Sequence, residues 1–174
     1  MKKFLCFLLS VILIMSLSAC IMEDVPIKEE GKEQSQSVSE KKDTTYKLND
    51  AAVFKDLKFT ATEIKESNGD GFFEPESGNV FVGVKFTIEN ISDEEQSVSS
   101  LLLFEGYVDD VKSSYSLSAA CAFDEGTLDG TVAAGKKLVG WYALEVPENW
   151  STIELDVQSS WLSNSSAKFV FENK

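Results

Sequence analysis

Hydrophobic and polar positions alternate along most of the chain after residue 45, which is the pattern of half-buried β-strands. The clearest run places a large apolar residue at every second position from Val80 to Ile88, and a second run has Ile153, Leu155 and Val157 between polar neighbours. Weaker strands are predicted at 51–54, 57–64, 100–107, 137–146 and 168–171. Residues 116–126 could form a helical turn, and no longer helical pattern is present. The pattern therefore predicts an all-β domain.

Turn-forming residues separate these strands at 67–71, 90–93, 134–136 and 147–149. Seven or more short strands divided in this way are typical of a sandwich or a barrel. We predict an immunoglobulin-like antiparallel β-sandwich of about seven to nine strands, with a small closed barrel as the alternative. Gly135 suits a turn that needs a positive φ, and Gly140 suits close packing on a strand. Asn90 suits a left-handed or side-chain-bonded turn position.

The first twenty residues follow a different pattern. Lys2 and Lys3 precede an apolar run from residue 4 to residue 17, which is shorter than the ~18 to 20 residues that cross a bilayer as a helix. The run ends in Leu-Ser-Ala19-Cys20, which is similar to the lipobox of bacterial lipoproteins. We predict a signal peptide over 1–19, cleavage between Ala19 and Cys20, and covalent diacylglycerol on Cys20. An ordinary secretory signal with a chance cysteine is the alternative.

Residues 20–45 are rich in Glu, Lys, Ser and Gln and contain no aromatic residue. Such a composition buries too little apolar surface to offset the entropy of ordering, so we predict a disordered tether. About 25 flexible residues have a mean reach of roughly 25 to 30 Å and a stretched limit near ~80 Å. The sandwich domain is predicted to cover residues 46–174.

Composition narrows the chemistry that this domain can perform. The formal net charge is −13, all sixteen basic residues are lysines, and the chain has no His. An acidic protein without Arg is unsuited to binding nucleic acid, and the usual serine or cysteine triads need a His. Once Cys6 leaves with the signal and Cys20 carries lipid, Cys121 is the remaining thiol, so no intrachain disulfide is expected. Its Ala and Phe neighbours predict a buried cysteine rather than a nucleophile.

Two stretches resemble a family of domains of unknown function found in Gram-positive lipoproteins. Residues 79–95 read NVFVGVKFTIENISDEE, and residues 128–147 read LDGTVAAGKKLVGWYALEVP. The family is grouped with the immunoprotective extracellular antigens (telokin-like), so the resemblance, which covers about 46–174, implies an immunoglobulin-like sandwich at the cell surface. Ala134 stands where Pro is usual and Leu144 where an aromatic residue is common, which affects the turn and the core shape. These motifs carry no chemistry.

Aromatic residues outside the strand pattern are candidate ligand-binding groups. Phe72 and Phe73 are adjacent in a Gly- and Glu-rich loop, and Trp141 alternates with Tyr142. We expect Trp141 to face the sheet surface opposite Leu144. Exposed rings can stack sugars or dock a partner, whereas buried rings fill a core. We take Phe72, Phe73 and Trp141 as candidate ligand-binding residues, although core packing for Trp141 and a loop cap for the Phe pair are favoured.

The same loop is a candidate metal site. Asp70, Glu74 and Glu76 place three carboxylates within seven residues, and the neighbouring glycines allow the backbone to bend. Calcium takes about six to eight oxygen ligands and needs neither His nor Cys. The spacing does not match the usual calcium loop, however, and a solvated acidic turn is the simpler interpretation.

These observations favour a lipid-anchored protein at the outer face of the cell membrane that carries a non-enzymatic binding or accessory domain. The expected partners are the membrane, through its lipid, and an envelope protein or wall component. No cofactor is expected apart from the covalent lipid. The alternatives are a calcium-dependent or carboxylate-based envelope enzyme and a purely structural envelope component.

Overall fold

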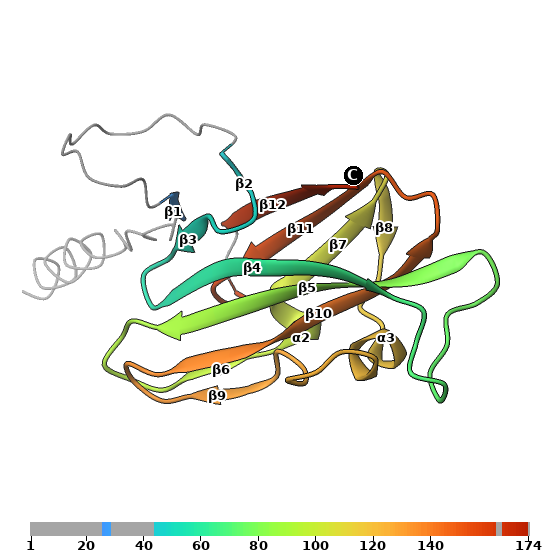
Figure 1. The fold of residues 1–174 in the computed structure, drawn as a ribbon. Helices are drawn as coiled ribbons and strands as arrows, with labels where there is room; N and C mark the ends of the chain where they lie inside the picture. Colours follow the sequence, from blue (N-terminus) through green and yellow to red (C-terminus); the bar gives the residue numbers. More distant parts are fainter. Residues whose placement is uncertain (1–25, 29–43, 163–164, 174) are drawn as a thin grey trace, which may run out of the picture.

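Two five-stranded sheets pack face to face in the computed structural model, which describes residues 26–28, 44–162 and 165–173 (Figure 1). The predicted all-β, immunoglobulin-like sandwich is thereby confirmed. The first sheet has the strand order β1 (Ile27–Lys28), β3 (Ala51–Val53), β4 (Leu57–Ser67), β5 (Asn79–Asn90) and β10 (Lys137–Pro147). The second has the order β2 (Thr45–Tyr46), β12 (Ser166–Glu172), β11 (Thr152–Gln158), β7 (Phe104–Val108) and β8 (Val111–Ser113).

Three short elements complete the fold. A two-stranded sheet pairs β6 (Gln96–Val98) with β9 (Gly130–Val132). Helix α2 (Ser100–Leu103) precedes β7, and helix α3 (Leu117–Cys121) falls inside the region predicted to form a helical turn. No helix among the described residues is long and apolar enough to cross a membrane.

The main core lies between the two large sheets, where the period-two pattern predicts it. The apolar residues at alternate positions of β5 and β11 face inward and are buried. Phe86 lies at the centre of an aromatic cluster, with ring centroids 5.3 Å from Phe104 and 5.3 Å from Phe169 in edge-to-face geometry. Such pairs stabilise the fold beyond the apolar area that they bury.

A second, smaller core covers the outer face of β5 and β10 next to α3. Trp141 faces this side of the sheet while Tyr142 faces the main core, as their alternation predicts. The Trp141 ring stacks on Phe123 with the centroids 4.9 Å apart. A Cβ at Gly83 would lie only 2.9 Å from atoms of both rings, so a glycine is needed for the rings to approach β5 this closely.

The structure departs from the sequence predictions at several points. Residues 100–103 form helix α2 instead of the first half of a strand, because the backbone closes a turn in which Leu103 N donates to Ser99 O. Cys121, expected to be buried, is exposed at the end of α3. In the predicted tether, Ile27–Lys28 pairs with β3 and Thr45 pairs with Lys168 of β12, so these residues join the sheets. The rest of the tether, residues 20–25 and 29–43, and the predicted signal peptide 1–19 lie outside the described residues, and with them Ala19 and Cys20.

Three residues have the roles that their chemistry predicts. Gly135 has a φ of 68° in the turn before β10. A Cβ on Gly140 would lie 2.6 Å from the backbone oxygen of Thr127, so this glycine permits close packing on the strand. Asn90 is 2% exposed and holds the turn after β5 through its side chain.

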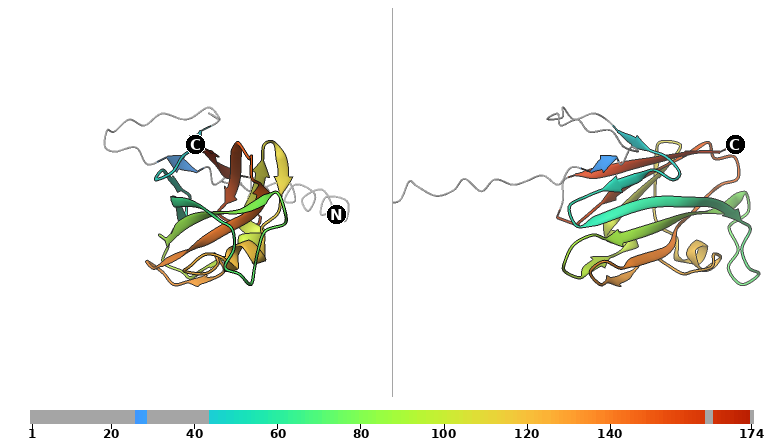
Figure 2. Two further views of the ribbon diagram at one scale, coloured as in Figure 1. Left: turned by 45° about the vertical axis from the view of Figure 1, so that its right-hand side comes forward. Right: turned by 60° about the vertical axis from the view of Figure 1, so that its left-hand side comes forward.

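The strand registers define two ends of the sandwich. At the entry end lie Ile27, the turn 54–56, the loop 90–95, the turn 133–136 and the loop 158–165. At the far end lie the loop 68–78, the β7–β8 turn 109–110, the turn 148–151 and the C-terminal end of β12. Figure 2 shows the C-terminus at this far end, and β1 at the opposite end of the molecule in its right-hand view.

Candidate functional site

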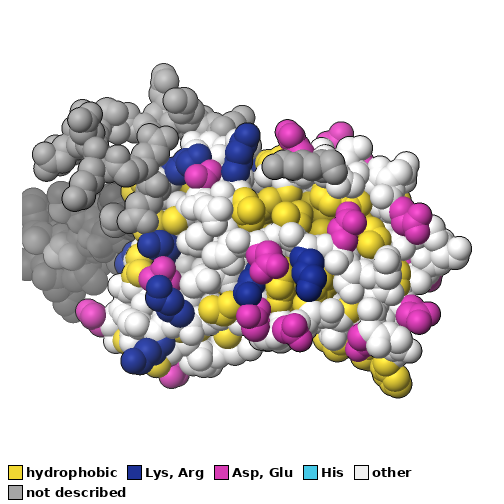
Figure 3. Space-filling view, in the orientation of Figure 1, with side chains coloured by type: hydrophobic (Ala, Val, Ile, Leu, Met, Phe, Trp, Pro, Cys, Tyr) yellow, Lys and Arg dark blue, Asp and Glu magenta, His cyan; other side chains and the backbone are white. Residues whose placement is uncertain are grey.

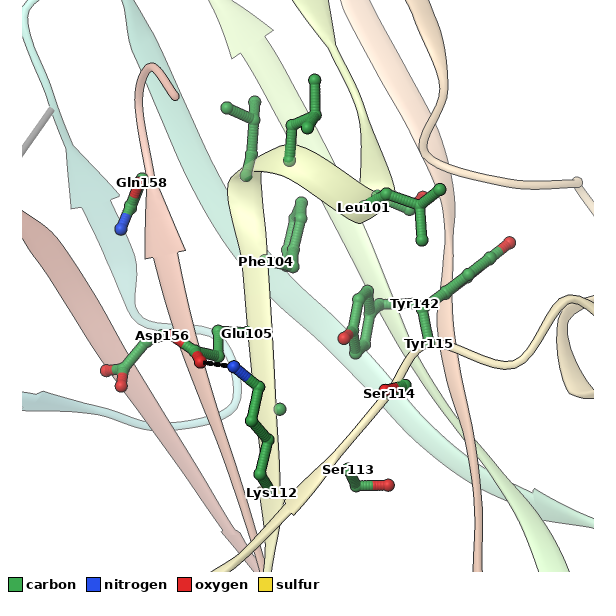
Figure 4. A pocket seen from close by; sticks show the side chains of 14 residues that line it. Leu101, Phe104, Glu105, Lys112, Ser113, Ser114, Tyr115, Tyr142, Asp156 and Gln158 are labelled. Carbon is green, nitrogen blue, oxygen red and sulfur yellow. Dashed lines mark hydrogen bonds and ion pairs between the residues drawn. The ribbon is translucent and has the colours of Figure 1, made fainter. Parts of the chain in front are cut away.

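A groove lies beside β7, at the edge of the second sheet. Strand β8 ends at Ser113, opposite Gly106, and the chain then leaves the sheet through Ser114 and Tyr115 toward α3. Within the described part of the chain, the first half of β7 therefore has no strand on its outer side. The cavity at this position has a volume of about 340 Å³ and is lined by α2, β7, the residues after β8, Tyr142, Asp156 and Gln158 (Figure 4).

One wall of the groove is aromatic. The Tyr142 ring stacks on Phe104 with centroids 5.1 Å apart and lies 5.4 Å from the Tyr115 ring. Burial, reinforced by the nearby Tyr115 and Glu105, raises the pKa of Tyr142 to about 12, so its hydroxyl stays protonated at neutral pH. Leu101 and Leu102 of α2 extend this apolar wall and are 72% and 62% exposed.

The hydroxyl of Tyr115 is buried without a hydrogen-bond partner among the described residues. Ser100 is close enough to affect the pKa of Tyr115, but its own hydroxyl donates to Asp129 Oδ2 at 2.9 Å. Burial, followed by the Asp129 carboxylate, raises the pKa of Tyr115, so this hydroxyl is a hydrogen-bond donor at neutral pH. An unpartnered buried hydroxyl costs free energy and marks the groove as incompletely satisfied.

The opposite wall carries two carboxylates. Glu105 and Asp156 are direct cross-strand partners on β7 and β11, and Figure 4 shows both on the side of β7 away from Tyr142. Lys112 forms an ion pair with Glu105, and this bond lowers the pKa of the Glu105 carboxyl. No hydrogen bond or ion pair from the described residues reaches Asp156, because its cross-strand neighbour Lys168 bonds Glu154 at 2.5 Å instead. Burial, then the charges of Glu154 and Glu105, raise the pKa of Asp156 despite the opposing charge of Lys168.

The backbone of β7 contributes to the groove as well. Val108 and Val111 pair across the two-residue turn Asp109–Asp110, whose φ values of 48° and 67° are typical of a tight hairpin. Backbone groups alternate between the two sides of an antiparallel strand. Val108 and Gly106 therefore bond toward β8, and the next residue of this series, Phe104, has its C=O on the groove side. The site thus offers a backbone carbonyl, two aromatic rings and an unpaired carboxylate to an extended ligand.

The three carboxylates of the acidic loop 68–78 do not gather into one group. The Asp70 carboxylate accepts hydrogen bonds from Phe73 N at 2.8 Å and Phe72 N at 2.9 Å, and these bonds lower the pKa of its carboxyl. Glu76 donates its backbone N–H to Glu145 Oε1 at 2.7 Å. Among the residues that the structure describes, no three Asp, Glu, His or Cys side chains form a group that could hold a metal ion. The predicted convergence of Asp70, Glu74 and Glu76 is therefore wrong, because the local turn uses Asp70 to bind its own backbone.

The predicted aromatic sites lie in different environments. Trp141 is 3% exposed and packs in the second core under α3 and Phe123, the environment that the sequence favoured over ligand binding. Phe72 is 84% exposed in the loop 68–78. Phe73 lies against the second core and lies 4.9 Å from the Phe72 ring. The Phe pair therefore caps the second core with one ring and presents the other to solvent.

The residues of the groove escaped the sequence analysis because they come from five separate elements, α2, β7, β8, β10 and β11. Glu105 and Asp156 occupy ordinary polar positions in alternating strands, and Tyr142 has the periodicity of a core residue. A possible signal was Ser113-Ser114, a polar pair that ends a strand without a glycine or proline turn.

Comparison with known proteins agrees with this fold. Residues 46–168 match the family model described as "Domain of unknown function (DUF4352)". A β-sandwich protein from Clostridium difficile has 16% sequence identity and a TM-score of 0.51, covering 79% of this chain and 100% of its own. A conserved hypothetical protein from Bacillus anthracis has 14% identity and a TM-score of 0.53, covering 71% and 94%. No curated protein matches the sequence.

A longer protein from Bacillus subtilis, ycdA, which has been suggested to be a lipoprotein, is also similar. It has 16% identity and a TM-score of 0.56 over 67% of this chain. The present chain spans only 36% of that protein.

Proposed function

This chain belongs to the DUF4352 family of domains of unknown function. We propose that it is a lipid-anchored protein at the outer face of the cell membrane, and that its sandwich binds a partner protein through the groove beside β7. The observation that carries the proposal is the uncovered half of β7, with the unpaired Asp156 carboxylate next to it.

Support for the lipid anchor comes from the sequence and from one relative. The apolar run and the Leu-Ser-Ala19-Cys20 motif have the order that lipid attachment requires. The similar protein from Bacillus subtilis has been suggested to be a lipoprotein. Attachment at Cys20 would hold the domain outside the cell.

The chemistry of the groove fits binding an extended peptide segment. A strand added beside Phe104 would gain backbone hydrogen bonds, as in proteins that bind peptides by extending a sheet. Leu101, Leu102 and the ring of Tyr115 would contact apolar side chains of the segment. A lysine or arginine of the segment would pair with Asp156, whose charge has no partner within hydrogen-bond distance among the described residues. We therefore propose a partner segment that combines apolar and basic residues.

Photo-crosslinking in cells tests this proposal. A crosslinking amino acid replaces Ser114, which is exposed at the groove, in the full-length chain, and a matched control places it at Ser97, which is exposed on β6. We expect a discrete protein adduct from position 114, no such adduct from position 97, and a weaker adduct at 114 when Asp156→Asn is added. Because Asp156 stabilises no described contact, its loss should not unfold the domain.

Three outcomes would contradict the proposal. Equal adducts from both positions would indicate non-specific contact. An adduct at position 114 that Asp156→Asn leaves unchanged would show that the partner does not bind through the groove. Turnover of cell-wall fragments by the purified chain would favour the enzyme alternative instead.

A further inference from the structure

The position of β1 determines how far the domain can lie from its anchor. Ile27 pairs with Val53 and Lys28 pairs with Ala52, and Lys28 Nζ bonds Asp50 Oδ2 at 2.7 Å. Only residues 21–26 then separate Cys20 from the sheet. Seven residue steps span at most about 25 Å, compared with ~80 Å if the whole tether were free. With a lipid on Cys20, β1 therefore keeps the entry end close to the bilayer surface.

The entry end exposes large apolar side chains. Ile27 is 70% exposed, and Trp161 and Leu162, in the loop after β11, are 67% and 72% exposed. Leu101 and Leu102 lie near the same end of the second sheet. They precede Phe104, which pairs with Val157 close to the loop 158–165, and they line the groove together with Gln158. Tryptophan, leucine and isoleucine at one end of a domain are the residues that partition into the bilayer interface.

Charge is distributed unevenly between the two ends. The far end carries many acidic side chains with Lys65 among them: Glu66, Asp70, Glu74, Glu76, Asp109, Asp110, Glu145, Glu148 and Glu172. The entry end is close to neutral, because its five lysines, Lys28, Lys55, Lys58, Lys136 and Lys137, lie among six acidic residues, Asp50, Asp56, Glu89, Asp93, Glu94 and Glu95. Figure 3 shows this separation, with lysines toward the end where β1 lies and acidic side chains dominating the opposite end. An anionic membrane attracts lysines near its surface and repels carboxylates.

We propose that the entry end, through Trp161, Leu162 and Ile27, rests on an anionic lipid bilayer and that the acidic far end points away from the cell. The proposal rests on the lipid anchor at Cys20. It goes beyond anchoring because it assigns a fixed orientation and a membrane-contacting surface to the folded domain.

Tryptophan fluorescence tests the orientation directly, because Trp141 and Trp150 are 3% and 4% exposed whereas Trp161 is open to solvent. The lipidated full-length chain is reconstituted into vesicles of phosphatidylglycerol and phosphatidylcholine, with or without bromine on the acyl chains. We expect brominated lipid to quench the emission and vesicles to protect it from acrylamide. Trp161→Phe should abolish both effects.

A matched control moves the exposed indole to the other end of the domain. The double variant Trp161→Phe, Phe72→Trp places it on the 84% exposed position of the far-end loop. Its emission should stay quenchable by acrylamide and insensitive to brominated lipid. Replacing phosphatidylglycerol by phosphatidylcholine should weaken the contact of Trp161, because the lysines then lose their anionic partner.

The outcomes separate this inference from the proposed anchor. If the chain carries lipid by mass and floats with the vesicles, yet Trp161 stays open to acrylamide, the orientation is wrong and the anchor stands. Equal quenching of Trp161 and of the tryptophan at position 72 also overturns the orientation. Protection of Trp161 in cells but not on vesicles would assign this surface to a protein partner instead. A chain without attached lipid contradicts both proposals.

Discussion

The side chain of Asn90 holds three segments of backbone together at the entry end. Its Nδ2 donates to Glu94 O at 2.7 Å and to Val132 O at 2.8 Å, while its Oδ1 accepts from Ser92 N at 3.0 Å. The β5–β6 turn and β9 are thereby fixed to the end of β5. Asn90 is 2% exposed and its bond to Val132 O is buried, so water could not easily replace the amide at that carbonyl.

Asn90→Ala should consequently lower the free energy of unfolding by about 2 to 3 kcal/mol, since the buried carbonyl oxygen of Val132 loses its hydrogen-bond donor. Urea denaturation of the parent and variant measures this. Asn149→Ala, at an exposed turn position, is the matched control and should change stability by less than about 0.5 kcal/mol. An Asn90→Ala protein as stable as its parent would show that the turn is held by other contacts.

Asp156 should reduce stability at neutral pH. Its pKa is raised in the folded state, so folding is opposed by the charged carboxylate and this cost disappears as pH falls through the folded pKa. Asp156→Asn is therefore expected to melt at a higher temperature than the parent at pH 7. The difference should shrink as pH is lowered toward the ordinary carboxyl pKa. Calorimetric melting across that range checks the sign, and a lower melting temperature at pH 7 would contradict it.

Residue environments were predictable only where they follow from local alternation. The opposite facing of Trp141 and Tyr142 followed from their adjacent positions on a strand. The groups that bury Trp141 did not, because α3, Phe123 and the space at Gly83 come from other parts of the chain. Cys121 shows the converse: its apolar neighbours suggested burial, yet the end of a short helix leaves it exposed.

Among the described elements, β1 and β2 are the shortest that join a large sheet, with two residues each. The two residues of β1 pair with β3, its Ile27 side chain is 70% exposed, and its ion pair with Asp50 is partly exposed to solvent. Exposed ion pairs contribute about 0 to 1 kcal/mol. The strand therefore positions the chain without contributing much to the stability of the sandwich.

Deleting residues 21–44 should accordingly change the free energy of unfolding by no more than about 1 kcal/mol. Chemical denaturation of the domain with and without this segment gives the measurement. Lys28→Ala in the longer chain is the companion variant, and it should account for most of any loss. A drop of several kcal/mol on deletion would show that the segment packs as a full strand.

Long strands were predictable and very short ones were not. β5 and β11 carry period-two alternation over seven or more residues, so their sequence alone defines an inner and an outer face. β1, β2 and β8 have two or three residues, too few for any periodicity to be recognised. The run of leucines before Phe104 fits a helix as well as a strand, and the turn closed by Ser99 decides between them. The groove was hidden for the same reason, because it exists only where β8 stops.

Viewed as a whole molecule, the chain combines a predicted targeting segment with a sandwich, and Cys20→Ala tests the connection between them. Without the thiol no diacylglycerol can attach, and the domain should be released or remain as uncleaved precursor. Lipid chains contribute about 0.8 kcal/mol for each buried CH₂, far more than the exposed apolar residues of the entry end. Fractionation after a high-salt wash, with the mass of the mature chain, measures the effect. Cleaved Cys20→Ala protein that stays with the membrane would contradict the lipid anchor.

The two-residue pairing of β1 also has a mechanical consequence. A force that pulls on the chain before Ile27 acts on the hydrogen bonds between β1 and β3. These two paired positions would separate while the much longer pairings of β4, β5 and β10 stay intact. Its release would free residues 29–44 as spare length of about 50 Å. The link between the domain and its N-terminal attachment would then lengthen under force before the core of the sandwich was strained. In this way β1 would be the first contact to break, and its loss would protect the folded domain.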